Sequence, residues 1–246
     1  MKKIQLFAPV LLMLFSVNVF SQTKAVEHFE KVIVSPYIKV IFVEGDKEEV
    51  SIENITVDKS KLHIEVNKQT LWLYLDGAKQ IPKQEKTNED GYKEKHPLYQ
   101  PTTVTAIITY KKLNDLSIRG EETQFVKTPI TADKFSLKIY GESKVTFKEV
   151  NFGELHAVFY GESTLEIRAG NIKEQKYTSY GESIINTSAV NGRTSRITAY
   201  GEADFTMNVS DRIKVTAFGD AKLHYKGDPE IVKGIHLGDL LIDEID

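Results

Sequence analysis

The sequence KIYGESKVTF at residues 138–147 recurs as VFYGESTLEI at 158–167 and TSYGESIINT at 178–187, and TAYGEADFTM follows at 198–207. Each copy has an aromatic residue, a glycine and an acid at the same offsets. Glycines continue the pattern on both sides, and they are Gly120, Gly141, Gly161, Gly181, Gly201, Gly219 and Gly238. Their spacings are 21, 20, 20, 20, 18 and 19 residues. A fixed period of this length is typical of a solenoid.

The segments between these glycines read as strands. Apolar, β-branched and aromatic residues alternate with polar ones, as in KFSLKIY and ELHAVFY, and a helical period is absent. We therefore predict an all-β protein whose fold is a parallel β-helix, or solenoid, with one coil every 20 residues or so.

The parity of the alternation predicts which residues face the interior of a coil. Apolar residues before and after the glycine share one parity, so the glycine lies at a bend between two strands, where a residue without Cβ is favoured. The small residue two positions later is expected to point inward at this corner. These small residues are Ser143, Ser163, Ser183, Ala203 and Ala221. The serines could form hydrogen bonds from coil to coil.

By the same parity, two rows of residues face outward. The aromatic row is Tyr140, Tyr160, Tyr180 and Tyr200, continued by Phe218. One interpretation is structural, because stacked aromatic rings stabilise neighbouring coils. The other is a binding strip for a glycan or another polymer, because an exposed aromatic strip is unusual without a function. The structural interpretation is favoured.

The acidic row is Glu142, Glu162, Glu182 and Glu202, continued by Asp220. Like charges at the spacing of adjacent strands repel, so the side chains must splay into solvent, pair with lysine or arginine, or share a cation. Calcium is one such cation, but the repeat lacks the Gly-Gly-x-Gly-x-Asp signature of calcium-binding β-rolls. We favour splayed side chains and predict no metal site.

The whole chain divides into three parts. Residues 1–21 begin with two lysines and an apolar run, which indicates a secretory signal peptide rather than a membrane anchor. Residues 22–101 form a strand-rich region of hairpins or a meander, in which the polar, proline-containing segment 77–101 is expected to be an exposed loop. Residues 102–246 form the repeats. No later segment is apolar enough to span a membrane.

Composition argues against several classes of function. The formal net charge is −3, and charges of both signs are interspersed, so a nucleic-acid partner is not expected. The chain has no cysteine, hence no disulfide and no thiolate chemistry. Its six histidines lack metal-ligand spacing, and no Gly-x-Ser-x-Gly elbow or phosphate loop is present. We predict no catalytic residues and no cofactor.

The chain resembles a bacterial family, the auto-transporter adhesin head (GIN) domains, from about Phe29 to its end. The opening FEKVIVSPYIKVIFVEGDKEEVSIE and the entry into the repeats, TAIITYKKLNDLSIRGEETQF, carry the resemblance. The resemblance implies a right-handed β-helix and an exported or envelope protein of Gram-negative bacteria. It implies no catalytic residues. The family usually has Ser-Gly-Ser-Gly at the corners, so the tyrosine and glutamate rows are special to this chain or its subgroup.

The sequence therefore predicts an exported, non-catalytic protein of the periplasm, outer surface or medium. Its expected role is adhesin-like binding, with a glycan or cell-surface polymer as partner, or a purely structural role. The enzymatic alternative is a polysaccharide-active β-helix, either a lyase or a glycosidase-like protein, and it rests on fold analogy. The oligomeric state is not indicated, although the acidic end LLIDEID (residues 240–246) discourages stacking on a partner.

Overall fold

The computed structural model describes residues 22–80, 84–89 and 92–246, so the predicted signal peptide lies outside the described residues. These residues form strands and one short 3₁₀ turn, η1 (Lys59–Lys61). The strands are β1 (Gln22–Ala25), β2 (Lys31–Val34), β3 (Ile38–Glu44), β4 (Glu49–Ile55), β5 (Leu62–Asn67), β6 (Thr70–Leu75), β7 (Gln84–Glu89), β8 (Tyr92–Pro97), β9 (Val104–Tyr110), β10 (Asp115–Gly120), β11 (Gln124–Val126), β12 (Ile130–Gly141), β13 (Lys144–Phe147), β14 (Val150–Tyr160), β15 (Ser163–Ile167), β16 (Gly170–Tyr180), β17 (Ser183–Tyr200), β18 (Ala203–Phe218), β19 (Ala221–Lys226), β20 (Glu230–Leu237) and β21 (Leu240–Glu244).

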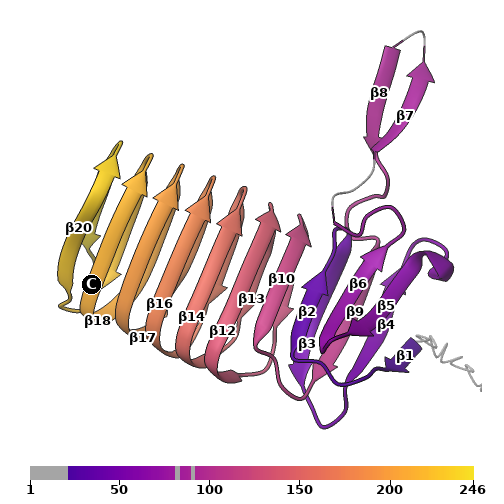
Figure 1. The fold of residues 1–246 in the computed structure, drawn as a ribbon, viewed down its shortest axis with the longest axis horizontal. Helices are drawn as coiled ribbons and strands as arrows, with labels where there is room; N and C mark the ends of the chain where they lie inside the picture. Colours follow the sequence, from indigo (N-terminus) through magenta and orange to yellow (C-terminus); the bar gives the residue numbers. More distant parts are fainter. Residues whose placement is uncertain (1–21, 81–83, 90–91) are drawn as a thin grey trace, which may run out of the picture.

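The repeats stack as a parallel β-solenoid, which confirms the predicted fold class (Figure 1). One wall contains β10, β12, β14, β16 and the C-terminal parts of β17 and β18, followed by β20. A second wall contains β11, β13, β15 and the N-terminal parts of β17 and β18, followed by β19 and β21. Equivalent residues of successive coils are direct neighbours, as in the pair Tyr140 and Tyr160.

The N-terminal region begins the same solenoid. Strand β2 is paired in parallel with both β10 and β6, and β3 is paired in parallel with both β11 and β9. The coil made by β2 and β3 therefore lies between two coils that come later in the sequence. Beyond this stack the strands become antiparallel, with β5 on β6, β4 on β9 and β1 on β4.

The segment 77–101, expected to be a loop, contains a hairpin instead. Strands β7 and β8 pair antiparallel from Gln84 opposite Pro97 to Glu89 opposite Tyr92. The hairpin projects from the solenoid in Figure 1. The polar composition predicted only that the segment would bury little apolar surface. The hairpin was missed because two short strands can satisfy one another's backbone groups by antiparallel pairing, which requires no alternating apolar pattern in the sequence.

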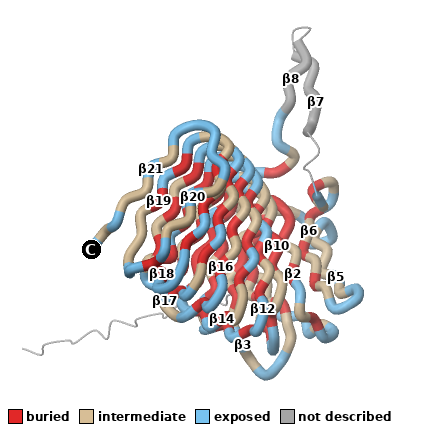
Figure 2. Tube along the Cα trace, turned by 60° about the vertical axis from the view of Figure 1, so that its left-hand side comes forward, coloured by how far each residue is buried: buried red, intermediate tan, exposed pale blue. Residues whose placement is uncertain are grey.

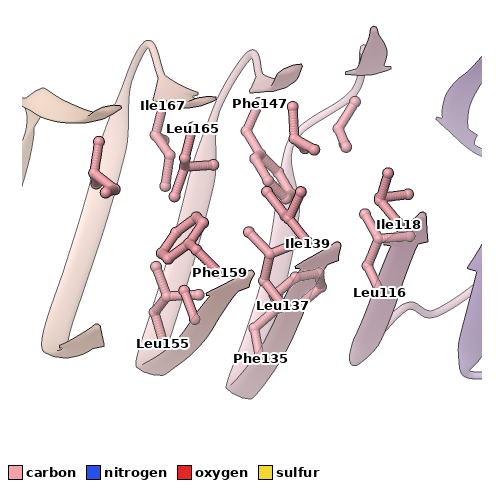
Figure 3. Close-up of a cluster of buried hydrophobic side chains, with 14 of the residues drawn as sticks. Leu116, Ile118, Phe135, Leu137, Ile139, Phe147, Leu155, Phe159, Leu165 and Ile167 are labelled. Atoms are coloured by element: carbon pink, nitrogen blue, oxygen red, sulfur yellow. The ribbon is translucent and has the colours of Figure 1, made fainter. Parts of the chain in front are cut away.

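Buried positions, red in Figure 2, recur along the strands of every coil, and their apolar side chains form the core. Successive layers pack on one another, as Leu137, Ile139 and Phe147 do beside Phe159 and Leu165 in Figure 3. Those five side chains are at most 1% exposed, as the parity of the sequence predicted. Burying a side chain of this size contributes about 1.5–3 kcal/mol relative to leaving it in water.

The glycine corners hold neighbouring coils close together. All seven predicted turn glycines have positive φ, between +100° at Gly161 and +129° at Gly219. A Cβ on Gly161 would lie 2.8 Å from the carbonyl oxygen of Gly141, so the next coil leaves no room for a side chain. The inward serines form hydrogen bonds between the same neighbouring coils. Ser163 Oγ donates to Gly141 O at 3.1 Å, and Ser143 Oγ donates to Gly120 O at 2.8 Å.

The shorter spacing between Gly201 and Gly219 is absorbed away from these corners. The pairing of β17 with β18 keeps its register at Thr187 opposite Met207, and shifts where Gly192 lies opposite Val209 and Thr194 opposite Arg212. From Thr194 onward the pairing is regular again, two residues shorter than before the shift, and it places Tyr200 opposite Phe218. This two-residue shortening is therefore absorbed away from the tyrosine corner, whereas the one-residue shift between β18 and β20 falls between Val215 and Ala217, close to Phe218.

Candidate functional site

The predicted tyrosine row forms a continuous stack on the surface. Its ring centroids are 4.9 Å apart from Tyr140 to Tyr160, 4.9 Å to Tyr180, 5.0 Å to Tyr200 and 5.1 Å to Phe218. The planes of neighbouring rings differ by 8° or less. Tyr160, Tyr180 and Tyr200 are each 40% exposed, so the row faces outward. In-register parallel pairing sets this spacing, because each ring sits on the equivalent residue of the next strand.

The stacking decides which part of each ring a ligand could reach. Neighbouring rings lie face to face, so the interior rings at Tyr160 and Tyr180 are largely covered on both faces. They present ring edges and phenolic hydroxyls to solvent. The geometry differs from a platform on which a sugar ring lies flat, and it suits a ligand that forms hydrogen bonds to a repeating line of hydroxyls.

The row extends past the tyrosines through residues that the sequence analysis did not select. Arg119 lies opposite Tyr140 in the strand pairing, with its Cζ 5.5 Å from the Tyr140 ring centroid and 5.7 Å from that of Trp72. The Arg119 side chain forms no hydrogen bond or ion pair with another described residue, and its buried Nε has no partner among them. Stacked between two rings, its guanidinium joins the tyrosine row to the N-terminal part of the molecule.

Beyond Arg119, a small aromatic and charged cluster completes the row. Lys79 Nζ lies 4.4 Å from the Trp72 ring centroid and 4.1 Å from that of Tyr74, and the His63 ring stacks on Tyr74 at 4.6 Å. The Tyr74 hydroxyl donates to Glu65 Oε1 at 2.6 Å. This hydrogen bond, with smaller contributions from Lys79 and His63, lowers the pKa of the Glu65 carboxyl and keeps it charged.

The acidic row borders a groove beside the tyrosines. The volume of this groove is about 420 Å³. The lining residues are Glu162, Ser163, Thr164, Glu182, Ser183, Ile184, Glu202, Ala203, Asp204, Asp220 and Lys222. Glu142, which belongs to the same row, lies outside this groove and lines a smaller one with Gly141 and Glu122. The structure thus brings three of the four predicted glutamates together.

The glutamates of this row splay into solvent. Glu142, Glu162, Glu182 and Glu202 are exposed, and none of them forms an ion pair with another described residue. Within the described part of the chain, no group of three His, Asp or Glu side chains is placed to hold a metal ion. Exposure to solvent screens the repulsion between neighbouring carboxylates.

A buried carboxylate marks the first corner of the repeats. Glu122 follows Gly120 at the offset that Ser143 occupies after Gly141, and it is only 5% exposed. Its oxygens accept hydrogen bonds from the backbone N–H groups of Thr102 at 3.5 Å and Glu121 at 3.2 Å. Burial raises the pKa of Glu122, although these backbone donors oppose the shift.

Of the residues that extend the row, Arg119 could have been identified from the sequence. Arg119 precedes Gly120 as Tyr140 precedes Gly141, so extending the repeat by one coil would have placed it in the row. Trp72 and Lys79 had no comparable signal. They reach the row only because β2 is paired with both β6 and β10, so the order of the strands in the sheet differs from their order in the sequence.

Comparison with known proteins agrees with this architecture. Residues 28–229 match the model of the family described as "Putative auto-transporter adhesin, head GIN domain". No curated protein matches the sequence significantly. No helix among the described residues is long and apolar enough to cross a membrane.

Three solved structures share the fold at low sequence identity. A "putative adhesin" from Bacteroides fragilis has a TM-score of 0.76 and 18% identity, over 92% of this chain and 96% of that chain. A "putative adhesin" from Parabacteroides merdae has a TM-score of 0.60 and 16% identity, over 92% and 95%. A "putative lipid binding protein" from Parabacteroides distasonis has a TM-score of 0.62 and 16% identity, over 93% and 98%.

Proposed function

The chain belongs to the family of auto-transporter adhesin head GIN domains, and from this membership we propose that it is an exported, non-catalytic protein with an adhesin-like binding role. The proposed contact surface is the tyrosine row together with the acidic groove beside it. The proposed ligand is a glycan or another hydroxyl-rich polymer of a cell surface. The adhesin-like family and neighbours support a surface or exported location.

The observation that carries the proposal is the repetition of one exposed chemistry along the solenoid. Tyr160, Tyr180 and Tyr200 expose the same edge and hydroxyl at intervals of 4.9–5.0 Å. A polymer presents its own groups at regular intervals, so a repeating surface can contact several of its units at once. Several weak contacts of this kind add up to useful avidity.

The charges of the groove restrict the class of ligand. Carboxylates accept hydrogen bonds from hydroxyl and amino groups, and the groove contains several acids against a single lysine, Lys222. A polyanionic polysaccharide would be repelled by this surface. We therefore expect neutral or amine-bearing glycans to bind, and uronate-rich or sulfated glycans to bind less.

A glycan array with matched variants tests the contact surface. The Tyr160→Ala/Tyr180→Ala variant should lose most of the glycan signal of the unmodified chain. The matched control is Asn171→Ala/Asn191→Ala, which removes another exposed pair, joined by an Asn191 Nδ2 to Asn171 Oδ1 hydrogen bond of 3.2 Å in adjacent coils. Equal loss in both variants, or unchanged binding in the tyrosine variant, would contradict the proposal.

The groove is tested separately by Glu162→Gln/Glu182→Gln, which keeps the shape of the side chains and removes their charge. Amine-bearing glycans should bind more weakly to this variant, while neutral glycans should change little. Incubating the unmodified chain with the same polysaccharides should release no new reducing or unsaturated ends. Turnover of any of them would favour the polysaccharide-active alternative.

A further inference from the structure

Both ends of the solenoid present strands with a free edge. At the N-terminal end, among the described residues, β5 pairs only with β6 and β1 only with β4. At the other end of the same stack, β20 pairs only with β18 and β21 only with β19. Figure 1 shows these two sets of strands at opposite ends of the molecule. An unpaired edge is a template for a strand of another chain.

The N-terminal end has a shallow basic groove between its edge strands. Its volume is about 180 Å³, and its apolar lining is Ile52, Ile55, Leu62 and Ile64. The only charged residues that line it are Lys24 and Lys59. Lys24 Nζ donates to Ile64 O at 3.1 Å and Lys59 Nζ donates to Gln22 Oε1 at 3.3 Å, and neither forms an ion pair with a described residue.

The C-terminal end has the opposite charge and is also apolar. Strands β20 and β21 contain Glu230, Asp243 and Glu244 against Lys233, and Asp239 lies in the turn between them. Three of the most exposed large apolar side chains of the described chain are also here. They are Ile235 at 69%, Leu237 at 65% and Leu241 at 47% exposure.

From these two surfaces we propose that the acidic C-terminal end of one copy of this chain docks on the basic groove at the N-terminal end of a second copy; the strands around this groove also contain Glu53 and Glu65, so the complementary charges are those of the groove itself. Opposite charges favour this head-to-tail contact, whereas two acidic ends or two basic ends repel each other. The acidic residues that discourage stacking between like ends are thus the residues that select the opposite end. The contact involves no ligand and does not depend on the proposed binding function.

The strand directions are compatible with docking on both walls at once. Strand β20 runs parallel to the wall that ends in β6, and β5 is antiparallel to β6, so β20 can pair antiparallel with β5 of the second copy. Strand β21 runs parallel to β9. Because β4 is antiparallel to β9 and β1 is antiparallel to β4, β1 has the same direction as β9, so β21 can pair in parallel with β1. Both walls would then continue across the interface.

The aromatic row would continue as well. Leu237 lies opposite Phe218 and occupies the last position of the row at the C-terminal end. At the N-terminal end the row finishes with His63 stacked on Tyr74. Docking would place Leu237 beside His63 of the second copy and remove this apolar side chain from water. Because the contact is heterologous and does not close on itself, it predicts open chains rather than a symmetric dimer.

Sedimentation velocity of the full chain over a wide concentration range tests this proposal, at about 0.05 M and 0.5 M salt because screening differs strongly between them. We expect dimers and longer species whose amount rises with protein concentration and falls at high salt. Two charge-reversal variants are Lys24→Glu/Lys59→Glu and Asp243→Lys/Glu244→Lys. Each alone should associate at least about tenfold more weakly, since its two ends then have the same charge.

The decisive measurement mixes the two variants. In the mixture the acidic N-terminal end of one variant meets the basic C-terminal end of the other, so association should return to the level of the unmodified chain. A monomer at all concentrations, a closed dimer, or a mixture no more associated than its components would each overturn the proposal. Circular dichroism and melting temperatures verify that the variants are folded, and the C-terminal variant tests the contact even if the N-terminal one is destabilised.

Discussion

The tyrosine stack yields a quantitative prediction for Tyr160→Ala. The Tyr160 ring stacks on two neighbours, Tyr140 and Tyr180, each at 4.9 Å. A stacked pair contributes about 0.5–1.5 kcal/mol beyond area burial, so losing two pairs should cost about 1–3 kcal/mol of unfolding free energy. Phe218 has a single stacked neighbour among the described residues, Tyr200 at 5.1 Å. The unfolding free energy that Phe218→Ala loses through stacking should therefore be about half as large.

Urea denaturation of single and double variants measures the stacking term itself. In a double-mutant cycle, Tyr160 and Tyr180 should couple by about 0.5–1.5 kcal/mol, because their rings are in contact. Tyr160 and Phe218 are separated by two further rings, so their effects should add within about 0.3–0.5 kcal/mol. Equal coupling in both cycles, or none in the first, would show that the row does not stabilise the solenoid through ring contacts.

Three further predictions concern the corner and the buried ionisable groups. Gly181→Ala should cost about 1–3 kcal/mol in a urea titration, because φ is +117° and the new Cβ would lie 2.9 Å from Gly161 O; an unchanged midpoint would refute the crowded corner. Burial raises the pKa of the Glu122 carboxyl above 4.5, so its contribution to stability is complete below about pH 4.5 and is lost as pH rises through the folded-state pKa. The melting temperature should therefore depend less on pH in Glu122→Gln than in the unmodified chain. An identical pH dependence in both would contradict this. Burial also raises the pKa of Tyr110 to about 12, so Tyr110→Phe should remove phenolate absorbance that develops near that pH but not near pH 10.

The repeating part of the fold could be predicted from the sequence because the period of the glycines and the alternation of apolar residues indicate the same structure. A glycine at a fixed period, with alternating apolar residues on both sides, leaves few alternatives to stacked coils. The inward serines at Ser143 and Ser163 and the outward ring of Tyr160 followed from parity alone. The parallel solenoid was confirmed for the same reason.

The N-terminal part could not be read in this way. Strand β2 is a short, mostly apolar segment, KVIV, and nothing in it indicates β10, its partner 84 residues later. The buried Gln124 shows the same difficulty. Its side chain accepts from Val40 N at 2.6 Å and donates to Ile38 O at 2.9 Å, so it replaces a backbone pair between distant strands. The proximity of Trp72 to Arg119 depends on these non-local pairings.

The position of the β2–β3 coil has a consequence for how the chain reaches its native state. This coil is held on both sides by segments synthesised after it, β6 with β9 on one side and β10 with β11 on the other. A nascent chain therefore cannot complete its first coil until residues up to about Val126 are available. Closing such long loops is slow, whereas each later coil adds on a neighbour some 20 residues away. We expect one slow nucleation step at the N-terminal end, followed by rapid coil-by-coil growth toward the C-terminus.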